Sequence, residues 1–272
     1  MIQPRKRFGQ HWLKSEKVLS QIVKAANLSE QDRVLEIGPG TGILTRSLLP
    51  TAQSVVAVEI DRDLCENLAK KLGKTDNFLL LQGDILSLNL DEQLAALSKF
   101  KNPNKVVANI PYNITGPILE KLLGKIAEPA PKPFDLMVLL VQKEVADRLY
   151  AKPGSTAFGA LSVRVQYLAE CELICQVPAK AFYPPPKVDS AVVRLRPRLI
   201  EPPALNPKHL ETLVKLGFSS KRKMLRNNLK GIIDLEKINQ FMETLQLNPQ
   251  SRAEDLSVAE WVALSNHLGQ YL

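Results

Sequence analysis

The 272-residue sequence predicts an α/β domain on a mostly parallel sheet, followed by a small all-α domain. Short β-rich runs alternate with amphipathic segments from Arg33 onwards, which is typical of a parallel sheet covered by helices on both faces. A proline-rich stretch near residues 198–207 interrupts regular structure, and the residues beyond it carry helical patterns without strand signals. We therefore expect a first domain over residues 1–200 and a second over residues 201–272.

The individual elements can be placed in order along the chain. Ser15 can cap a first helix, because apolar residues follow it at helical spacing as far as Ala26. The β-rich runs RVLEIG, SVVAVEI, NFLLLQGD, KVVANIP and FDLMVLLVQ then alternate with helical patterns. The last two runs, CELICQV and VDSAVVRLR, are joined by PAKAFYPPPK, which is too short to contain a crossover helix, so they should lie antiparallel.

Composition and charge limit the classes of function. The formal net charge of +8 favours a polyanionic partner. No apolar stretch approaches the roughly 18 residues needed to span a bilayer, and no hydrophobic segment follows the basic start of the chain. We therefore expect a mature cytoplasmic protein without a membrane partner. Cys65, Cys171 and Cys175 show no zinc-ligand pairing, so reduced structural thiols and no metal are expected.

A glycine-rich turn joins the first strand to the next helix. Residues 38–42 read GPGTG and lie where a nucleotide-like ligand would meet a strand end and a helix N-terminus. The spacing G-x-G-x-G differs from the dinucleotide fingerprint G-x-G-x-x-G. A tight turn without any ligand is the alternative interpretation.

Carboxylates end the next two strands, Glu59 in AVEID and Asp84 in QGDIL. The carboxyl ends of successive parallel strands border the binding crevice of an open α/β sheet. Glu59 has the spacing from Gly38 of an acid that holds ribose hydroxyls, and Asp84 can accept a hydrogen bond from an adenine amine. Taken singly, either acid is equally compatible with a helix cap or a solvated turn.

The fourth strand ends in Asn109-Ile110-Pro111-Tyr112 and reaches the same crevice. The side-chain oxygen of Asn109 and the carbonyl of Ile110 can accept both hydrogens of an exocyclic amine and orient its lone pair for attack. Asparagine cannot take a proton as a carboxylate can, so it predicts positioning rather than general-base catalysis. Tyr112 offers a stacking face for a base, and Phe182 can supply the opposing face. A strand-ending turn with a packed tyrosine is the alternative.

The glycine turn and the acidic strand tips together resemble the S-adenosylmethionine-dependent methyltransferases of the seven-stranded, Rossmann-like class I. This resemblance implies S-adenosyl-L-methionine as the cofactor. Gly38 would lie beside its methionine part, Glu59 would hold its ribose and Asp84 would contact its adenine. The remaining residues implied at the cofactor are Ile60 and Ile85, on either side of the adenine ring, and Asn109.

Four separated motifs are together similar to the ribosomal RNA adenine N6-dimethyltransferases over nearly the whole chain: RKRFGQHWL, NIPY, AFYPPPKVDSAVVRL and GFSSKRKMLRNNL. GFSSKRKMLRNNL and SRAEDLS are similar to members that dimethylate two adjacent adenosines near the 3′ end of 16S ribosomal RNA. The resemblance implies that RNA, within the small ribosomal subunit or its precursor, as the partner. It also places His11 and Leu13 over the cofactor, although many members have asparagine at position 11 and phenylalanine at position 12.

Two basic clusters predict contacts with RNA phosphates, although a solvated helix face is the alternative for the second cluster. The expected RNA-binding residues are Arg5, Lys6, Arg7, Lys221, Arg222, Lys223 and Arg226. We expect a monomer. The alternative functions are methylation of adenine in 23S ribosomal RNA or DNA, and a non-catalytic RNA-binding assembly or transcription factor on the same fold.

Overall fold

A computed structural model describes residues 3–5, 9–198 and 200–269, and the chain packs into two compact units. The first unit comprises Met1–Leu122, Lys132–Ala146 and Glu172–Arg196, and the second comprises Leu123–Pro131, Asp147–Cys171 and Pro197–Leu272. The two units interleave along the chain, so packing alone draws no single boundary between residues 200 and 201. The expected domains 1–200 and 201–272 stay a prediction.

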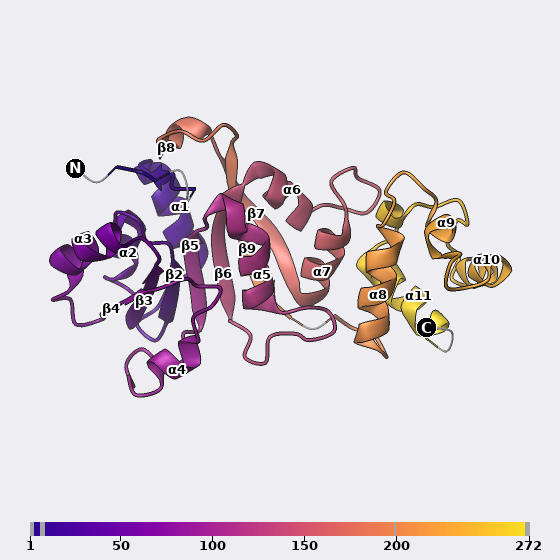
Figure 1. Cartoon of the computed structure of the whole chain (residues 1–272), viewed down its shortest axis with the longest axis horizontal. Helices are drawn as coiled ribbons and strands as arrows, with labels where there is room; N and C mark the ends of the chain where they lie inside the picture. Colours follow the sequence, from indigo (N-terminus) through magenta and orange to yellow (C-terminus); the bar gives the residue numbers. More distant parts are fainter. Residues whose placement is uncertain (1–2, 6–8, 199, 270–272) are drawn as a thin grey trace. The chain divides into compact units, whose positions relative to one another are not determined.

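Each β-rich run of the sequence forms a strand (Figure 1). The strands are β1 (Trp12–Leu13), β2 (Arg33–Ile37), β3 (Ser54–Glu59), β4 (Phe78–Gln82), β5 (Lys105–Asn109), β6 (Leu136–Gln142), β7 (Ala169–Val177), β8 (Phe182–Tyr183) and β9 (Ser190–Pro197). The helices are α1 (Glu16–Ala26), α2 (Ile43–Leu48), α3 (Arg62–Leu72), α4 (Leu90–Leu94), α5 (Thr115–Leu123), α6 (Lys143–Leu149), α7 (Ala160–Leu168), α8 (Pro207–Gly217), α9 (Leu225–Leu229), α10 (Leu235–Thr244) and α11 (Val258–Leu268), with short 3-10 turns at Tyr112–Ile114, Ala179–Ala181 and Ala253–Asp255.

Within the described residues the main sheet has seven strands in the order β4-β3-β2-β5-β6-β9-β7. The first five of these pair in parallel, and β9 runs antiparallel to β6. Strands β3 and β6 are almost wholly buried, as expected for parallel strands covered on both faces. The predicted seven-stranded α/β fold is confirmed, and the two last runs are neighbours, as their short connection predicted.

The strand order determines where a ligand-binding site is expected in the sheet. The chain passes from β2 to β3 on one side and later returns to β5 on the other side of β2. The carboxyl ends of parallel strands therefore diverge around a switch point beside β2, which is where open α/β sheets bind ligands. Gly38, Glu59, Asp84 and Asn109 all lie at or just after the carboxyl ends of these strands.

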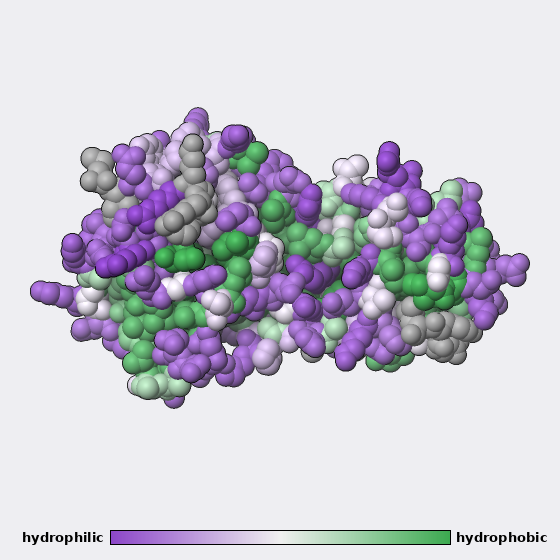
Figure 2. Space-filling model, viewed as in Figure 1, coloured by the Kyte–Doolittle hydropathy of each residue, from purple (hydrophilic) through white to green (hydrophobic). Residues whose placement is uncertain are grey.

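Helices α1 and α3 of the first unit both begin at side-chain caps. Ser15 Oγ accepts a hydrogen bond from the Val18 N–H at 3.4 Å, which confirms the predicted start of α1. Asp61 caps α3, and its Oδ1 accepts from the Asp63 N–H at 3.1 Å. Helix α3 buries one apolar stripe, while hydrophilic side chains cover its outer surface (Figure 2). Only two residues separate the end of β3 from the start of α3. The helix cap Asp61 therefore lies two residues after Glu59.

The second unit packs its helices around a buried tryptophan. Trp261 of α11 is fully buried, and its ring centroid lies 5.6 Å from that of Phe218. A Cβ atom at Gly217 would lie 2.4 Å from Trp261 Cη2, so only glycine fits this crossing. The described part of residues 201–272 holds helices and one isolated bridge, but no strand. None of the described helices combines the length and the apolar character required to cross a membrane.

Candidate active site

A cleft opens in the first unit at the carboxyl ends of β2 to β5. It encloses about 660 Å³, part of which is open to solvent. The predicted residues that line it are His11, Gly38, Glu59, Ile60, Asp84, Ile85, Asn109, Ile110 and Tyr112. The N-terminal arm, residues 3–14, adds Gln10 and Trp12 to the wall. The structure therefore gathers the four predicted strand tips and the arm around one space.

The glycine turn needs backbone that other residues rarely adopt. Gly38, Gly40 and Gly42 have φ angles of +66°, +58° and +79°. The Gly38 N–H donates to Val58 O at 2.9 Å, which ties the turn to the neighbouring strand. A Cβ atom at Gly42 would also lie 2.6 Å from Leu68 Cδ2. The turn is thus fixed against β3 and α3, with its first two glycines at the cleft.

The carboxylate of Glu59 is held in place by backbone donors. It is 5% exposed and accepts hydrogen bonds from the Gly40 N–H at 3.2 Å and the Asp61 N–H at 2.9 Å. Burial raises the pKa of Glu59, and these hydrogen bonds offset part of that shift. A preorganised acceptor at this point suits a ligand with hydroxyl groups.

Glu36, inside β2, is a buried acid that the sequence analysis did not single out as a site residue. It is 1% exposed, and among the described residues its Oε2 atom has no hydrogen-bond partner. Burial, with a smaller contribution from the nearby charge of Glu59, raises the pKa of Glu36 to about 8. The carboxyl group of Glu36 therefore carries a proton in the folded protein at neutral pH.

The part of the cleft beside the ends of β3 and β4 is lined by one acid and two isoleucines. Asp84 Oδ1 accepts from the Leu86 N–H at 2.9 Å, which fixes the carboxylate at the end of β4. Ile60 is 46% exposed, whereas Ile85 is 4% exposed, and both line the cleft. An aromatic ring placed between them would cover the exposed face of Ile60. The adenine sandwich implied by the resemblance therefore fits this geometry.

Asn109 is oriented by the arm. Its Nδ2 donates a hydrogen bond to the backbone carbonyl of His11 at 3.0 Å. Because the amide nitrogen is turned towards the arm, the Oδ1 atom of Asn109 is left as the acceptor for another group. The next residue, Ile110, also lines the cleft and donates its N–H to Leu140 O at 3.0 Å. This anchors Ile110, whose carbonyl was predicted as the second acceptor.

Tyr112 is fixed at both its ring and its hydroxyl group. Its hydroxyl lies 2.5 Å from Ser190 Oγ, and its pKa is raised by burial. The His11 ring stacks on the Tyr112 ring with centroids 5.5 Å apart and an interplanar angle of 25°. The Nδ1–H of His11 donates to Pro184 O at 2.8 Å. In this structure the imidazole therefore occupies a face of Tyr112 on which a base was expected to stack.

Two predicted residues do not face the cleft. Phe182 is fully buried in the core, where its strand position is opposite that of Leu13, which is 5% exposed. Side chains alternate across a strand, so the neighbouring Tyr183 points outward and is 59% exposed. Phe182 thus offers no open stacking face here, and the buried Leu13 side chain does not line the cleft. Their predicted roles stay predictions.

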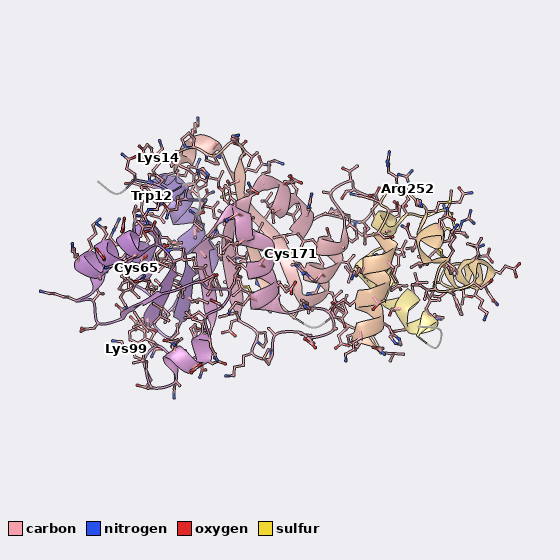
Figure 3. All side chains as sticks on the ribbon, in the orientation of Figure 1. Trp12, Lys14, Cys65, Lys99, Cys171 and Arg252 are labelled. Atoms are coloured by element: carbon pink, nitrogen blue, oxygen red, sulfur yellow. The ribbon has the colours of Figure 1, made fainter. Side chains whose placement is uncertain are left out.

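The arm residue Arg5 is bound to carboxylates, with 37% of its side chain still exposed. Its Nη1 donates to Asp61 Oδ1 at 2.9 Å, and its Nη2 pairs with Asp63. The expectation that Arg5 contacts RNA stays a prediction, and in this structure the almost fully buried Asp61 pairs with its charge. Lys6 and Arg7 lie outside the described residues. Further along, Trp12 and Lys14 (Figure 3) belong to a segment paired with residues 181–183.

The basic cluster of the second unit is partly engaged within that unit. Lys221 Nζ lies 3.2 Å from Glu254 Oε2 and also donates to Thr156 O. Arg226 Nη1 donates to Asn239 Oδ1 at 3.5 Å. Arg222 and Lys223 are exposed. Lys221 is exposed as well, but its ammonium group is already engaged, so Arg222 and Lys223 are better placed for phosphate contacts than Lys221 and Arg226.

The sequence analysis missed three residues that hold the site together: Gln10, Asp61 and Ser190. Asp61 had a signal, because it directly precedes the helical pattern of α3 and is a preferred N-cap residue. Gln10 and Ser190 had none, since their partners lie 51 and 78 positions away in the chain. Within the residues that the structure describes, no group of His, Cys, Asp and Glu side chains could hold a metal ion.

Comparison with known sequences gives a full-length match. A family model described as ribosomal RNA adenine dimethylase matches residues 1–270. The ribosomal RNA small subunit methyltransferase A of Nostoc punctiforme is 69% identical over 274 residues, covering 98% of this chain and 96% of the relative. The protein of the same name from a Picosynechococcus species is 58% identical over 270 residues, covering 99% of both chains.

Solved structures give the same picture. A dimethyladenosine transferase from Plasmodium falciparum superposes with a TM-score of 0.80 at 28% identity, covering 96% of this chain and 98% of that chain. The 23S rRNA methyltransferase ErmE superposes with a TM-score of 0.74, also at 28% identity, covering 95% of this chain and all of ErmE, 100%. Both likenesses include the helical C-terminal region as well as the sheet.

Proposed function

The chain belongs to the ribosomal RNA adenine dimethylase family, and we propose that it dimethylates two adjacent adenosines near the 3′ end of 16S ribosomal RNA. Family membership carries the enzyme class, the ribosomal RNA substrate and the cofactor S-adenosyl-L-methionine, and it confirms the resemblance drawn from the four motifs. The choice of the small subunit is supported by relatives of up to 69% identity that are named for it. The proposed product is N6,N6-dimethyladenosine.

The observation that carries this proposal is the orientation of Asn109. Its amide nitrogen is bound to the His11 carbonyl, so its oxygen is the atom available to an incoming amine. The same cleft holds Glu59 and Asp84 on the other side. A site with one oriented neutral acceptor beside carboxylate acceptors suits an amine target next to a nucleoside cofactor.

The cofactor half of the cleft fits S-adenosyl-L-methionine, which supplies an electrophilic methyl group on a sulfonium when bound. In this proposal Glu59 accepts from its ribose hydroxyls and Asp84 accepts from its adenine amine. Ile60 and Ile85 flank the adenine ring. Gly38, at positive φ, lets the backbone approach the methionine part closely.

The amine half of the cleft positions the target nitrogen. Asn109 Oδ1 and the Ile110 carbonyl accept the two amine hydrogens, which favours a pyramidal nitrogen with its lone pair aimed at the methyl group. When bound, the cofactor would supply the methyl group to this nitrogen and leave as neutral S-adenosylhomocysteine, so that the amine would take over the positive charge. The amine then releases its proton to water, so no side chain has to act as a base.

Tyr112 provides the stacking face for the target adenine. Base–aromatic stacking is worth roughly 1 to 3 kcal/mol, enough to support a nucleotide taken out of its own stack. The His11 ring has to leave Tyr112 if the base uses the face that this ring covers. For the second methyl group, the monomethylated amine must turn so that its remaining hydrogen meets one acceptor.

The remaining parts of the proposal concern partner, location and domains. We propose that residues 1–200 carry the chemistry and that residues 201–272 bind RNA, with Arg222 and Lys223 at phosphates. The substrate is the small ribosomal subunit or its precursor, and the enzyme acts as a monomer in the cytoplasm. The exposure of Arg222 and Lys223 supports the contact surface.

The test is incubation with labelled cofactor and immature 30S particles, 23S ribosomal RNA or DNA, followed by digestion and mass spectrometry. Dimethyladenosine is expected only from the 30S particles. Label confined to 23S RNA would favour the activity for which ErmE is named, and label confined to DNA would point to a DNA enzyme. Retention of 30S particles without any transfer would indicate a binding protein.

A second measurement tests the contact surface. Replacing Arg222 and Lys223 with Ala should lower the magnitude of the slope of log K against log salt by roughly 0.7 to 0.9 per lost phosphate contact. Replacing Lys215 of α8 with Ala provides a matched control, because Lys215 is exposed in the same unit but lies outside the cluster. An unchanged slope in the double variant would mean that the cluster is a solvated helix face without phosphate contacts.

A further inference from the structure

We propose that Arg5 and Gln10 act with Asp61 as a latch that positions the N-terminal arm for methyl transfer, so that these three are positioning residues. This inference rests on the proposed function, because it explains how the two halves of the same cleft are kept in register. Nothing in the family match assigns these side chains a role. The argument starts from the acid at the centre of the latch.

Asp61 is an almost buried carboxylate with a full set of donors. It is 1% exposed. Its Oδ1 accepts from the Asp63 N–H at 3.1 Å and from Arg5 Nη1 at 2.9 Å. Its Oδ2 accepts from Gln10 Nε2 at 2.9 Å. A buried charge is costly unless it is paired and hydrogen-bonded, so the arm supplies what the carboxylate needs.

A hydrogen bond within the arm completes this arrangement. The Arg5 N–H donates to Gln10 Oε1 at 2.7 Å, so the Gln10 amide bridges the arm backbone and Asp61. Both polar atoms of the Gln10 side chain are therefore used, one in each direction. Arg5 adds a pairing with Asp63, the second residue of α3. Arg5 and Gln10 are thus both fixed against the start of α3.

The latch is connected directly to the cofactor half of the cleft. The backbone N–H of Asp61 donates to Glu59 Oε1 at 2.9 Å, while its side chain holds the arm. Gln10 itself lines the cleft beside Glu59 and Ile60. Displacement of the arm would therefore remove one wall of the proposed cofactor site.

The latch is also connected to the amine half through the next residue. His11 follows Gln10, and its carbonyl accepts the hydrogen bond that orients the Asn109 amide at 3.0 Å. Release of Gln10 removes one of the contacts that hold this part of the arm, beside the ring contacts of His11 with Pro184 and Tyr112. The His11 carbonyl can then shift, and Asn109 can turn its amide nitrogen towards the target amine. An amide nitrogen is a donor and cannot accept the amine hydrogens. The latch thus couples cofactor binding to orientation of the acceptor.

The experiment compares Gln10→Ala with Arg62→Ala in the full chain. Gln10 caps no helix, whereas Arg62 is a 76% exposed neighbour of Asp61 that pairs with Glu66. Loss of a hydrogen bond to a charged, buried group predicts a dissociation constant for S-adenosylhomocysteine about tenfold higher in Gln10→Ala. The rate of one turnover on 30S particles at saturating cofactor should also fall. Arg62→Ala should leave both quantities unchanged.

An exchange of the two groups provides a rescue. Asp61→Asn alone removes the charge that binds Arg5. If the new amide nitrogen faces Gln10 Nε2, two donors also oppose each other. This variant should therefore weaken cofactor binding. Asp61→Asn combined with Gln10→Glu reverses the direction of the hydrogen bond, because the new amide donates to the new carboxylate. Restored binding in the double variant, relative to Asp61→Asn, supports positioning by this contact. Asparagine also caps helices, so α3 keeps its start.

Two results would overturn the latch. One is wild-type binding and turnover in Gln10→Ala, and the other is a loss in Gln10→Ala that follows only from a lowered unfolding temperature. Binding of S-adenosylhomocysteine requires no RNA, so the latch is tested even if the proposed 16S substrate is wrong. Failure of wild-type protein to methylate 30S particles would instead reject the proposed function while leaving the binding comparison valid.

Discussion

The two ends of the cleft are held in place by different kinds of contact. At the cofactor end, Glu59 is fixed by the N–H groups of Gly40 and Asp61, all at or near adjacent strand ends. At the amine end, Asn109 and Tyr112 depend on partners that lie 98 and 78 positions away in the chain. The cofactor end is thus largely a property of the sheet. The amine end exists only when the arm and the start of β9 are in place.

The largest expected effect breaks the amine end alone. Asn109→Ala removes the oriented acceptor and should lower the rate of methyl transfer by about 10² to 10³-fold, the range found when one preorganised polar group is lost. Binding of S-adenosylhomocysteine should remain close to wild type, because the carboxylates of the cofactor end are untouched. Single-turnover assays and calorimetry measure the two quantities.

Asn113→Ala is the matched control for this variant, since Asn113 is an exposed asparagine four residues further along the same segment. A rate near wild type for Asn109→Ala would remove the proposed role. Equal losses of rate and of cofactor binding would show that the two ends are not separable.

The next effect breaks the cofactor end alone. Glu59→Gln keeps the shape of the side chain but replaces one acceptor oxygen with a donor and removes the charge. The dissociation constant for S-adenosylhomocysteine should rise by about 10 to 100-fold, as expected for a lost charge-assisted hydrogen bond. Turnover at saturating cofactor should change little. Glu66→Gln, on the exposed face of α3, serves as the control, and an unchanged constant in Glu59→Gln would contradict the ribose role.

The difference between the two ends also explains what the sequence could reveal. Gly38, Glu59, Asp84 and Asn109 could be predicted to lie together because each lies at or just after the end of a strand, and the alternation of strand and helix patterns predicts one parallel sheet. No contact between distant segments was needed for that step. The prediction of the fold succeeded for the same reason.

Apart from Asp61, which has a local N-cap signal, the contacts that the sequence did not reveal join distant segments. Phe182 and Tyr183 are both aromatic, and only pairing of β8 with the arm decides which one is buried. From the sequence alone Arg5 is expected to be a free positive charge, because its partner Asp61 lies 56 positions away in the chain. Local patterns carry no information about such partners.

A third prediction concerns the buried acid Glu36 of β2 and the pH dependence of the free energy of unfolding. Folded Glu36 has a pKa of about 8 against an ordinary value of 4.5, so the folded protein keeps a proton that the unfolded chain releases. Stability is therefore lost as the pH rises from about 4.5 to about 8, at up to roughly 1.4 kcal/mol per pH unit. Glu36→Gln cannot ionise and should flatten this dependence.

Urea unfolding at several pH values measures this slope in wild type, Glu36→Gln and the exposed control Glu66→Gln. Glu36→Gln should gain most over wild type at the alkaline end of the window and least near pH 5. Parallel stability curves for wild type and Glu36→Gln would show that another group governs the dependence.

The smallest expected effect sharpens the amine end. Ser190 is fully buried, and its Oγ lies 2.5 Å from the hydroxyl of Tyr112. Ser190→Ala leaves that hydroxyl without its partner, which costs about 1 kcal/mol, or roughly fivefold in the rate on 30S particles if the ring shifts. Tyr112→Phe with Ser190→Ala removes both polar groups and should be no slower than Ser190→Ala alone, because no buried hydroxyl is then left unpaired. Additive losses in this double-mutant cycle would mean that the pair does not act as a unit in holding the base.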